Sequence, residues 1–296
     1  MSKCYHIFTH NDFDGAVSLL AFMWARPEGI FHFEPLNNMD LEDKLRIHLD
    51  NTCDDPSIVV LDLALRDELV PILNRKGVTI IDHHKSSERF IEKFDKAKVF
   101  YKDFSSCALL VRKLLAATSP ELTIEQKLLI ALADDFDCYR LQLPDSYDLN
   151  ILFWSEYRGK FAKFIKDYQK GFKPFTPEQK RAIAYIKKEA VEEAEKVDIF
   201  YGELLVGGKK KKVIAGMTQR LVPMVMDHLI KKHTPDLFFF ININTQKVSL
   251  RQCTKEDPID IGLFAEKICD GGGHEFAAGG KITPLFLEIT KNLKPL

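Results

Sequence analysis

Acidic and histidine side chains follow three short apolar runs in this sequence, at the point where each run ends. They are His10, Asp12 and Asp14 after residues 4–9, Asp62 after residues 58–61, and Asp82, His83 and His84 after residues 78–81. Short apolar runs of this kind are typical of buried parallel strands. Open α/β sheets bind ligands beyond the carboxyl ends of their strands, so carboxylates and imidazoles gathered there indicate a divalent metal site.

The spacing of the aspartates indicates room for two cations. Asp12 and Asp14 are two residues apart, so in an extended segment they face the same way and each can hold one cation. Asp62, from the next of these strand ends, can bridge both. Two neighbouring divalent cations suit hydrolysis of a phosphoester, because they hold the phosphoryl group and lower the pKa of a bound water toward about 7.

Each of these residues also has an ordinary structural explanation. Asp12 and Asp14 are typical of a turn followed by a helix cap, and Asp62 is a common type of helix N-cap. His83 and His84 are ordinary polar residues at a strand end. The common position of all of them at adjacent strand ends favours the metal site over these separate explanations.

Composition narrows the class of protein. The chain has 296 residues, enough for two domains, and its formal net charge of -1 argues against a globally basic nucleic-acid binder. The six cysteines contain no C-x-x-C pair, which argues against a zinc knuckle or a disulfide framework and favours a reducing compartment. With no signal-peptide core and no membrane-length apolar stretch, we expect a cytoplasmic protein without membrane contact.

The order of the expected elements predicts an α/β fold with two domains and a connector. Residues 1–175 alternate strands with helices, which predicts a mostly parallel sheet with helices on both faces. Residues 176–198 predict a long charged linker helix that starts with Thr176 as N-cap and Pro177 at the first helical position. Residues 199–296 are β-rich and predict a smaller α/β domain with a mixed sheet, in which the lysines at 209–212 lie at a hairpin tip.

Taken together, the motifs resemble those of a known family. Four of them resemble, in order, the motifs of the DHH phosphoesterase superfamily: residues 10–15, Asp62, residues 82–84 and the acidic cluster at 134–137. Residues 271–274, with Ala277, Ala278 and Gly279, resemble the signature of the DHH-associated C-terminal domain. The resemblance covers essentially the whole chain, and five motifs in the right order are far more specific than any one of them.

The resemblance implies two bound manganese ions, with magnesium as the alternative metal. Its implied ligands are His10, Asp12 and Asp62 for one ion, and Asp14, Asp62, His83 and Asp135 for the other. Two further residues would act in catalysis. Asp82 would support a histidine tautomer as an outer carboxylate, and His84 would face the substrate phosphate.

The sequence departs from the family pattern at two points. The commoner pattern has its first histidine at the position of Phe8, whereas here His10 lies only two residues before Asp12. The fourth motif offers three carboxylates, at positions 134, 135 and 137. The spacing from Asp135 to the aromatic Tyr139 resembles that of the small-oligonucleotide members, so Asp135 is the expected ligand.

The C-terminal motif predicts a phosphate-binding surface. Gly271, Gly272 and Gly273 would let main-chain N–H groups approach an anion without obstruction by a Cβ atom. His274 would add a donor, and Arg251 would offer a guanidinium fork. The alternatives are a plain flexible turn for the glycines and a surface strand residue for Arg251.

The expected function is that of a metal-dependent phosphoesterase of the phosphodiesterase or exonuclease type. The expected substrate is a short oligonucleotide or a small nucleotide. Cleavage of a cyclic dinucleotide and dephosphorylation of phosphoadenosine phosphate are the alternative reactions. A nucleotide sensor that binds without cleaving is the alternative of a different class. A homodimer is one of the oligomeric states that the sequence allows.

Overall fold

The computed structural model describes residues 3–37, 40–51, 57–206, 208–254, 258–273 and 275–296. The chain divides into two compact units, Met1–Thr176 and Pro177–Leu296, here called the first and the second unit. Each unit has a sheet of its own, so the predicted α/β class with two separate sheets is confirmed. The region predicted as a linker contains helix α8 (Pro177–Ala194), which groups with the second unit.

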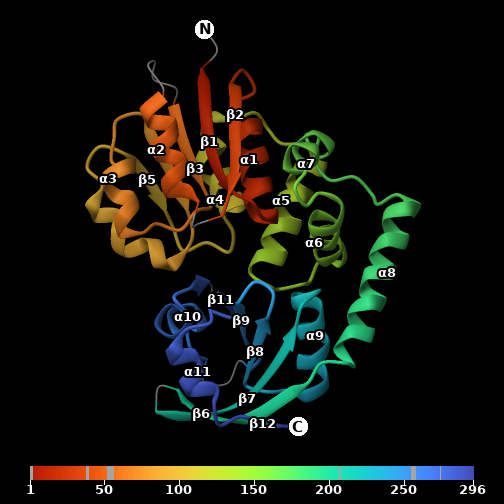
Figure 1. Ribbon diagram of the computed structural model, residues 1–296. Coiled ribbons are helices and arrows are strands. Elements are labelled where there is room, and N and C mark those ends of the chain that lie inside the picture. Colours follow the sequence, from red (N-terminus) through yellow and green to blue (C-terminus); the bar gives the residue numbers. More distant parts are fainter. Residues whose placement is uncertain (1–2, 38–39, 52–56, 207, 255–257, 274) are drawn as a thin grey trace. The chain divides into compact units, whose positions relative to one another are not determined.

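The first unit is built on a five-stranded parallel sheet in the order β2-β1-β3-β4-β5 (Figure 1). The strands are β1 (Cys4–His10), β2 (Ile30–Leu36), β3 (Ser57–Leu61), β4 (Val78–Asp82) and β5 (Lys98–Tyr101). From β1 the strand order proceeds to β2 on one side and to β3 on the other. The carboxyl ends of β1 and β3 therefore meet at a topological switch point, where such sheets bind ligands.

Helices cover both faces of this sheet, as the alternation of strands and helices predicts. They are α1 (Phe13–Ala25), α2 (Leu41–Asn51), α3 (Val70–Leu73), α4 (Cys107–Leu115), α5 (Ile124–Asp137), α6 (Pro144–Glu156) and α7 (Phe161–Asp167), with 3-10 turns at Asp67–Leu69, Lys85–Lys93 and Ala116–Thr118. On one face Phe8, Val60 and Ile80 form a buried core with apolar residues of α2 and α3. Helices α1, α4 and α5 pack on one another (Figure 1), and almost every residue of α1 is buried.

The second unit has a seven-stranded mixed sheet in the order β10-β11-β9-β8-β7-β6-β12. Its strands are β6 (Ile199–Val206), β7 (Lys209–Thr218), β8 (Leu237–Asn242), β9 (Lys247–Gln252), β10 (Gly272–Gly273), β11 (Ala277–Lys281) and β12 (Lys294–Pro295). Only β7 and β8 pair in parallel. Helices α8 and α9 (Val222–His233) cover Phe238 and Phe240 on one face. Helices α10 (Ile261–Cys269) and α11 (Pro284–Thr290) cover Phe239 and Leu250 on the other.

The predicted place of the lysine run is wrong. Lysines 209–212 lie within strand β7 and pair with Glu203–Val206 of β6, rather than at a hairpin tip. Their side chains alternate like those of any strand, so Lys211 is buried while Lys210 and Lys212 are exposed.

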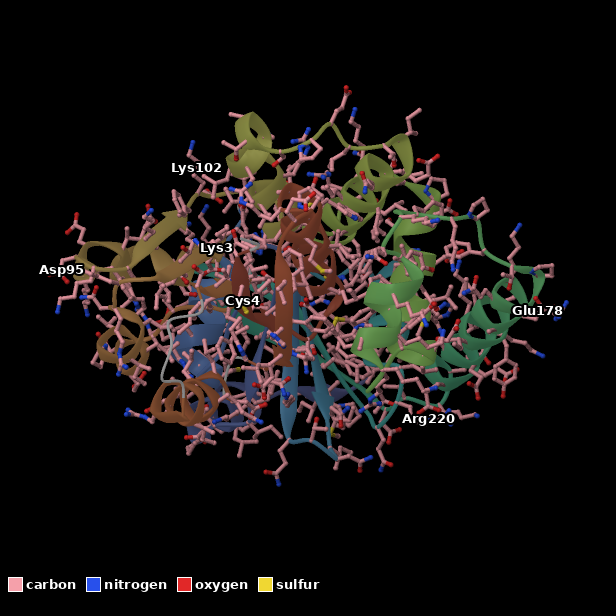
Figure 2. All side chains as sticks on the ribbon, turned by 90° about the horizontal axis from the view of Figure 1, so that it is seen from above. Lys3, Cys4, Asp95, Lys102, Glu178 and Arg220 are labelled. Atoms are coloured by element: carbon pink, nitrogen blue, oxygen red, sulfur yellow. The ribbon has the colours of Figure 1, made fainter. Side chains whose placement is uncertain are left out.

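Charged side chains of both signs lie on the outside of the two units. Asp95, Lys102 and Glu178 are exposed and point away from the ribbon (Figure 2). Within the described ranges, no helix combines the length and the low polarity that crossing a membrane requires.

Candidate metal centre

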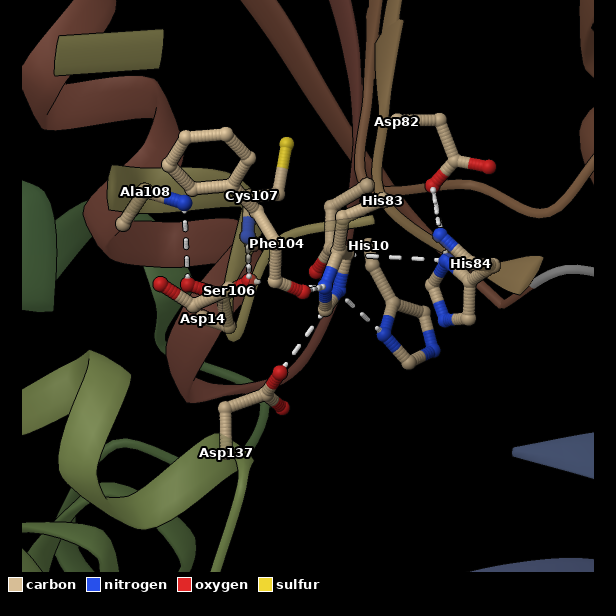
Figure 3. Close-up of polar contacts among 12 residues, drawn as sticks. His10, Asp14, Asp82, His83, His84, Phe104, Ser106, Cys107, Ala108 and Asp137 are labelled. Carbon is tan, nitrogen blue, oxygen red and sulfur yellow. Dashed lines mark hydrogen bonds and ion pairs between the residues drawn. The ribbon is translucent and has the colours of Figure 1, made fainter. Parts of the chain in front are cut away.

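The carboxyl ends of β1, β3 and β4 bring most of the predicted metal residues into one cluster (Figure 3). Ligand atoms of His10, Asp12 and Asp62 form one group that could hold a cation. A second group contains Asp14 and His83, and Asp62 also groups with both histidines that follow β4. These residues are far apart in the chain, and the parallel order of the strands places them at one edge of the sheet.

The corner between β1 and α1 positions His10 and Asp12. Asp12 is the N-cap of α1, and its Oδ1 accepts a hydrogen bond from the Gly15 N–H at 2.9 Å. Its Oδ2 lies 2.7 Å from Nδ1 of His10. The helix-cap explanation is therefore correct, and it leaves the second carboxylate oxygen beside the histidine. A Cβ atom at residue 15 would lie 2.1 Å from the carbonyl oxygen of His10, so only glycine permits this corner.

Asp14 lies in the first turn of α1, not in the extended segment that the sequence predicts. Its carboxylate is buried and accepts hydrogen bonds from the N–H groups of Cys107 at 2.7 Å and Ala108 at 3.1 Å. These are the first two residues of α4, where the helix dipole favours a negative charge. The carboxylate is thus fixed in place before any cation binds.

Asp62 faces both groups of ligand atoms. Its Oδ1 lies 3.2 Å from Nε2 of His83, and its Oδ2 lies 3.9 Å from Nδ1 of His10. The residue has a φ of 58°, a left-handed backbone conformation that an aspartate adopts at a cost. Backbone strain of this kind concentrates at functional sites. The two oxygens of one buried carboxylate therefore point into two neighbouring ligand groups.

The hydrogen bonds of His83 show that these residues fit a cation. Its Nδ1–H donates to the carbonyl of Phe104 at 3.0 Å, so in the neutral ring Nε2 carries the lone pair (Figure 3). That nitrogen faces carboxylate oxygens of Asp62 at 3.2 Å, Asp137 at 3.5 Å and Asp14 at 3.8 Å. A lone pair facing three carboxylates is repulsive unless a cation or a proton lies between them. Oδ1 of Asp62 is moreover buried without a hydrogen-bond donor among the described residues.

The same crowding shifts the pKa values of the cluster. Burial opposes the protonation of His10, but the carboxylates of Asp12 and Asp62 outweigh it and raise the pKa of His10 to about 9. Burial would raise the pKa of Asp12, but His10 lowers it to about 2. Burial raises the pKa of Asp137 to about 7, with His83 opposing and Asp62 adding to the increase. Without metal the cluster therefore retains protons, which a divalent cation would replace.

Asp82 and His84, the two predicted catalytic residues, form a pair of their own. Nδ1–H of His84 donates to Oδ1 of Asp82 at 2.7 Å, and Ser87 donates to Oδ2. Burial opposes ionisation of Asp82, but His84 and Ser87 outweigh it and hold the pKa of this carboxyl well below its usual range. Asp82 therefore orients His84, whereas the tautomer of His83 is set by the Phe104 carbonyl.

In the fourth motif, the structure groups a carboxylate other than that of Asp135 with Asp14 and His83. Asp135 accepts hydrogen bonds from the N–H groups of Gln142 and Leu143, both at 3.0 Å, and from Ser146 Oγ at 2.6 Å. Its oxygens are thus occupied by the turn before α6. The carboxylate that joins Asp14 and His83 is Asp137.

The sequence holds a signal that identifies Asp137. Helix α5 extends to Asp137 itself. Ile130 and Ala133 lie on its buried side, and helical spacing continues that stripe to residue 137.

The predicted substrate-binding residues lie in the second unit, at one edge of its sheet. Arg251 is on β9 and pairs with Ala277 of β11, which in turn pairs with the glycine strand β10. A Cβ atom at Gly271 would lie 1.9 Å from the carbonyl oxygen of Gly279. One at Gly273, where φ is 150°, would lie 2.4 Å from the carbonyl oxygen of Ala277. These two glycines are required by strand packing, and the flexible-turn alternative is wrong for Gly272 and Gly273, which form β10.

Gly272 differs from its two neighbours. A Cβ atom there would meet nothing within 4 Å, and the residue is not in a left-handed conformation. Packing therefore does not explain this glycine, which leaves close approach of a ligand as a reason for it. His274, the fourth residue of the motif, lies outside the described residues.

Comparison with known proteins shows what the sequence and the fold of this chain are similar to. The DHHA1 domain family matches residues 207–293. No curated protein matches the sequence. Among solved structures, the DHH domain of a protein described as a member of a family of ribosomal proteins is 15% identical, with a TM-score of 0.63 over 99% of this chain and 87% of its own.

Two other solved structures are similar over nearly the whole of this chain. The manganese complex of RecJ from Thermus thermophilus is 14% identical, with a TM-score of 0.59, and the match covers 100% of this chain but 53% of RecJ. The pGpG-specific phosphodiesterase PggH from Vibrio cholerae is 13% identical, with a TM-score of 0.55 over 97% of this chain and 96% of its own. The predicted resemblance is thus confirmed: this chain has the fold of the DHH phosphoesterases, and its residues 207–293 match the DHHA1 domain family.

Proposed function

We propose that this protein is a phosphoesterase that uses two divalent cations, manganese or alternatively magnesium, to hydrolyse short oligonucleotides or small nucleotides. The observation that carries the proposal is the position of Asp62. One oxygen of its carboxylate faces His83 and the other faces His10. A bridging carboxylate between two ligand groups is the arrangement that two neighbouring cations need.

Different residues would bind the two cations and the substrate. His10, Asp12 and Asp62 would hold one cation, and Asp14, Asp62, His83 and Asp137 the other. When bound, such a pair of cations supplies an activated water and neutralises charge on the phosphoryl group. His84 would meet a substrate phosphate through Nε2, because its Nδ1–H is fixed on Asp82. Gly272 and Arg251 in the second unit stay the predicted substrate-binding residues.

The similarity to PggH supports a short substrate. That protein is described as specific for pGpG, a linear dinucleotide, and the match spans nearly all of both chains. This chain covers 53% of RecJ from Thermus thermophilus, although it covers 89% of another solved structure described as exonuclease RecJ. The formal net charge of -1 gives no global basic field of the kind that would favour binding of long single strands.

The proposal is tested with end-labelled strands of graded length at fixed salt and with added Mn²⁺. We expect kcat/KM on strands of two to five nucleotides to exceed that on a strand of several tens of nucleotides by about tenfold or more, or ~1.4 kcal/mol of transition-state free energy. Equal or faster processive degradation of the long strand would contradict the short-substrate assignment.

The same assay separates the alternatives when it includes a cyclic dinucleotide, phosphoadenosine phosphate and pyrophosphate. Release of phosphate from phosphoadenosine phosphate alone would make the protein a nucleotide phosphatase. Cleavage confined to the cyclic dinucleotide would make it a cyclic-dinucleotide phosphodiesterase. Tight nucleotide binding without any turnover would make it a sensor, although a sensor has no need of so complete a set of carboxylates.

A further inference from the structure

We infer that Asp134 is a positioning residue that organises one of the two cation sites, the group of Asp14, His83 and Asp137. Its carboxylate oxygens accept hydrogen bonds from two serines and an arginine outside this group. It acts through the segment 104–108, whose backbone holds Asp14 and His83. The inference rests on the proposed two-cation site and goes beyond it, because it assigns the selective control of one site to a residue outside both ligand groups.

Asp134 is buried and forms an unusual concentration of charge-assisted contacts. Its Oδ1 accepts hydrogen bonds from the hydroxyls of Ser105 and Ser106, the latter at 2.9 Å. Its Oδ2 accepts from a guanidinium N–H of Arg140. Ser106 is also the N-cap of α4, where its oxygen accepts from the Leu109 N–H at 3.2 Å. One carboxylate thus ties the start of α4 to the end of α5.

The segment tied by Asp134 supplies the outer contacts of the cation group (Figure 3). The carbonyl of Phe104 fixes Nδ1–H of His83, and the N–H groups of Cys107 and Ala108 hold the two oxygens of Asp14. These three backbone groups lie within five residues of the chain. Movement of this segment would therefore turn the imidazole and the carboxylate together.

Asp134 is also linked to the third member of the group through its own helix. It lies three residues before Asp137 in α5, and residues three apart lie on the same side of a helix. Anchoring Asp134 to Ser105 and Ser106 sets the rotation of α5 that directs Asp137 toward His83. The outer contacts of the other cation group belong to the β1–α1 corner instead.

The test measures manganese binding to the full chain, by calorimetric titration and by electron paramagnetic resonance. Wild-type protein should bind two ions and give the spectrum of a coupled pair. Asp134→Ala should weaken the binding of one of the two ions by about 10- to 100-fold, the usual effect of losing a residue that hydrogen-bonds to a ligand. At intermediate Mn²⁺ it should give the six-line spectrum of an isolated ion. Asp134→Asn keeps an oxygen acceptor for the serines, so its manganese affinity should fall less than that of Asp134→Ala.

Thr123→Ala is the matched control, because it removes the N-cap of the same helix at its other end and leaves the 104–108 segment intact. It should lower thermal stability yet retain both ions. Ser105→Ala and Ser105→Thr form a second pair. Ser105→Ala, which lacks the hydroxyl, should weaken binding of the same ion, whereas Ser105→Thr should not.

The possible results separate two kinds of failure. Two tightly bound ions in Asp134→Ala, or an equal loss of metal in Thr123→Ala, would overturn the positioning role while the proposed function stands. Wild-type protein that binds no second ion would overturn the proposed two-cation site and the positioning role with it.

Discussion

Asp134, Asp135 and Asp137 lie within one turn of α5 and have three different sets of contacts. Asp134 binds the serines before α4, and Asp135 binds the turn before α6. Asp137 lies beside His83. Asp12 and Asp14 also accept hydrogen bonds from backbone N–H groups, so position makes the difference. Asp137 faces an imidazole and other carboxylates, whereas the contacts of Asp135 lie in the turn before α6.

This distinction predicts opposite results for two neighbouring substitutions. Asp137→Asn should remove one manganese ion and most of the turnover, because a ligand loses its charge. Asp135→Asn should keep both ions but lower the free energy of unfolding by about 1–3 kcal/mol, since the buried turn loses charge-assisted hydrogen bonds. Metal stoichiometry and urea denaturation of both variants check the prediction. Loss of metal in Asp135→Asn only would restore Asp135 as the ligand.

Asp62 allows the sharpest test of the bridge between the two sites. Asparagine tolerates the left-handed backbone conformation found there better than alanine does, so Asp62→Asn changes the charge with little added strain. We expect it to weaken the binding of both ions. It should lower kcat by more than the roughly 10- to 100-fold that is typical when a residue hydrogen-bonded to a metal ligand is replaced. Manganese titration and steady-state kinetics measure the two effects. Wild-type affinity at either site would contradict the bridging role.

At the scale of elements, the β1–α1 corner joins the fold to the chemistry. The cap of α1 by Asp12, the close approach of Gly15 to the His10 carbonyl and the hydrogen bond from the Thr9 hydroxyl to the Gly15 carbonyl at 2.8 Å fix the same few residues. A ligand on this corner therefore cannot move without disturbing the start of the helix.

Gly15→Ala should open this corner, because the added methyl group would lie against the His10 carbonyl. We expect a loss of about 1–3 kcal/mol of stability, typical of overpacking, together with weaker binding of the ion held by His10 and Asp12. Thermal unfolding and manganese titration measure the two. The control is Gly272→Ala, where the same methyl group meets open space and should change neither quantity. Equal behaviour of the two variants would contradict this account of the corner.

At the scale of the whole molecule, the cluster makes stability depend on pH, and the direction of this dependence should reverse when metal is bound. The pKa of His10 is raised from 6.5 to about 9, so its contribution to stability is present below pH 6.5 and is lost as the pH rises through 9. The pKa of Asp137 is raised from 3.8 to about 7, so its contribution is lost between these values. Both groups therefore make metal-free protein less stable as the pH rises.

We expect the Tm of chelator-treated protein to fall between pH 6 and 9. With excess Mn²⁺ the Tm should rise over the same range, because the ligands must lose their protons to bind metal. Thermal scans at pH 6, 7, 8 and 9 with chelator and with Mn²⁺ measure both slopes. Parallel curves under the two conditions would show that the cluster does not bind the metal.

Local sequence patterns are enough to predict the strands and the sheet edge that form the site. Apolar runs of strand length, each followed by an acidic or histidine residue, predicted the parallel strands and the edge at which His10, Asp12, Asp62 and His83 meet. These features are local, because they depend on hydrophobic patterning within a few residues and on the rule that parallel strands end at one edge. The two units with separate sheets followed from the same patterns.

The polar groups that complete the site depend on contacts between distant parts of the chain. The choice of Asp137 over Asp135 depends on how far α5 extends and which way it faces, and the neutral tautomer of His83 depends on a carbonyl 21 residues away. The lysine run belongs to a strand for a similar reason, since pairing with β6 outweighs the local preference for a turn. Such contacts join residues distant in the chain, and their free energy comes from packing that no short window of sequence contains.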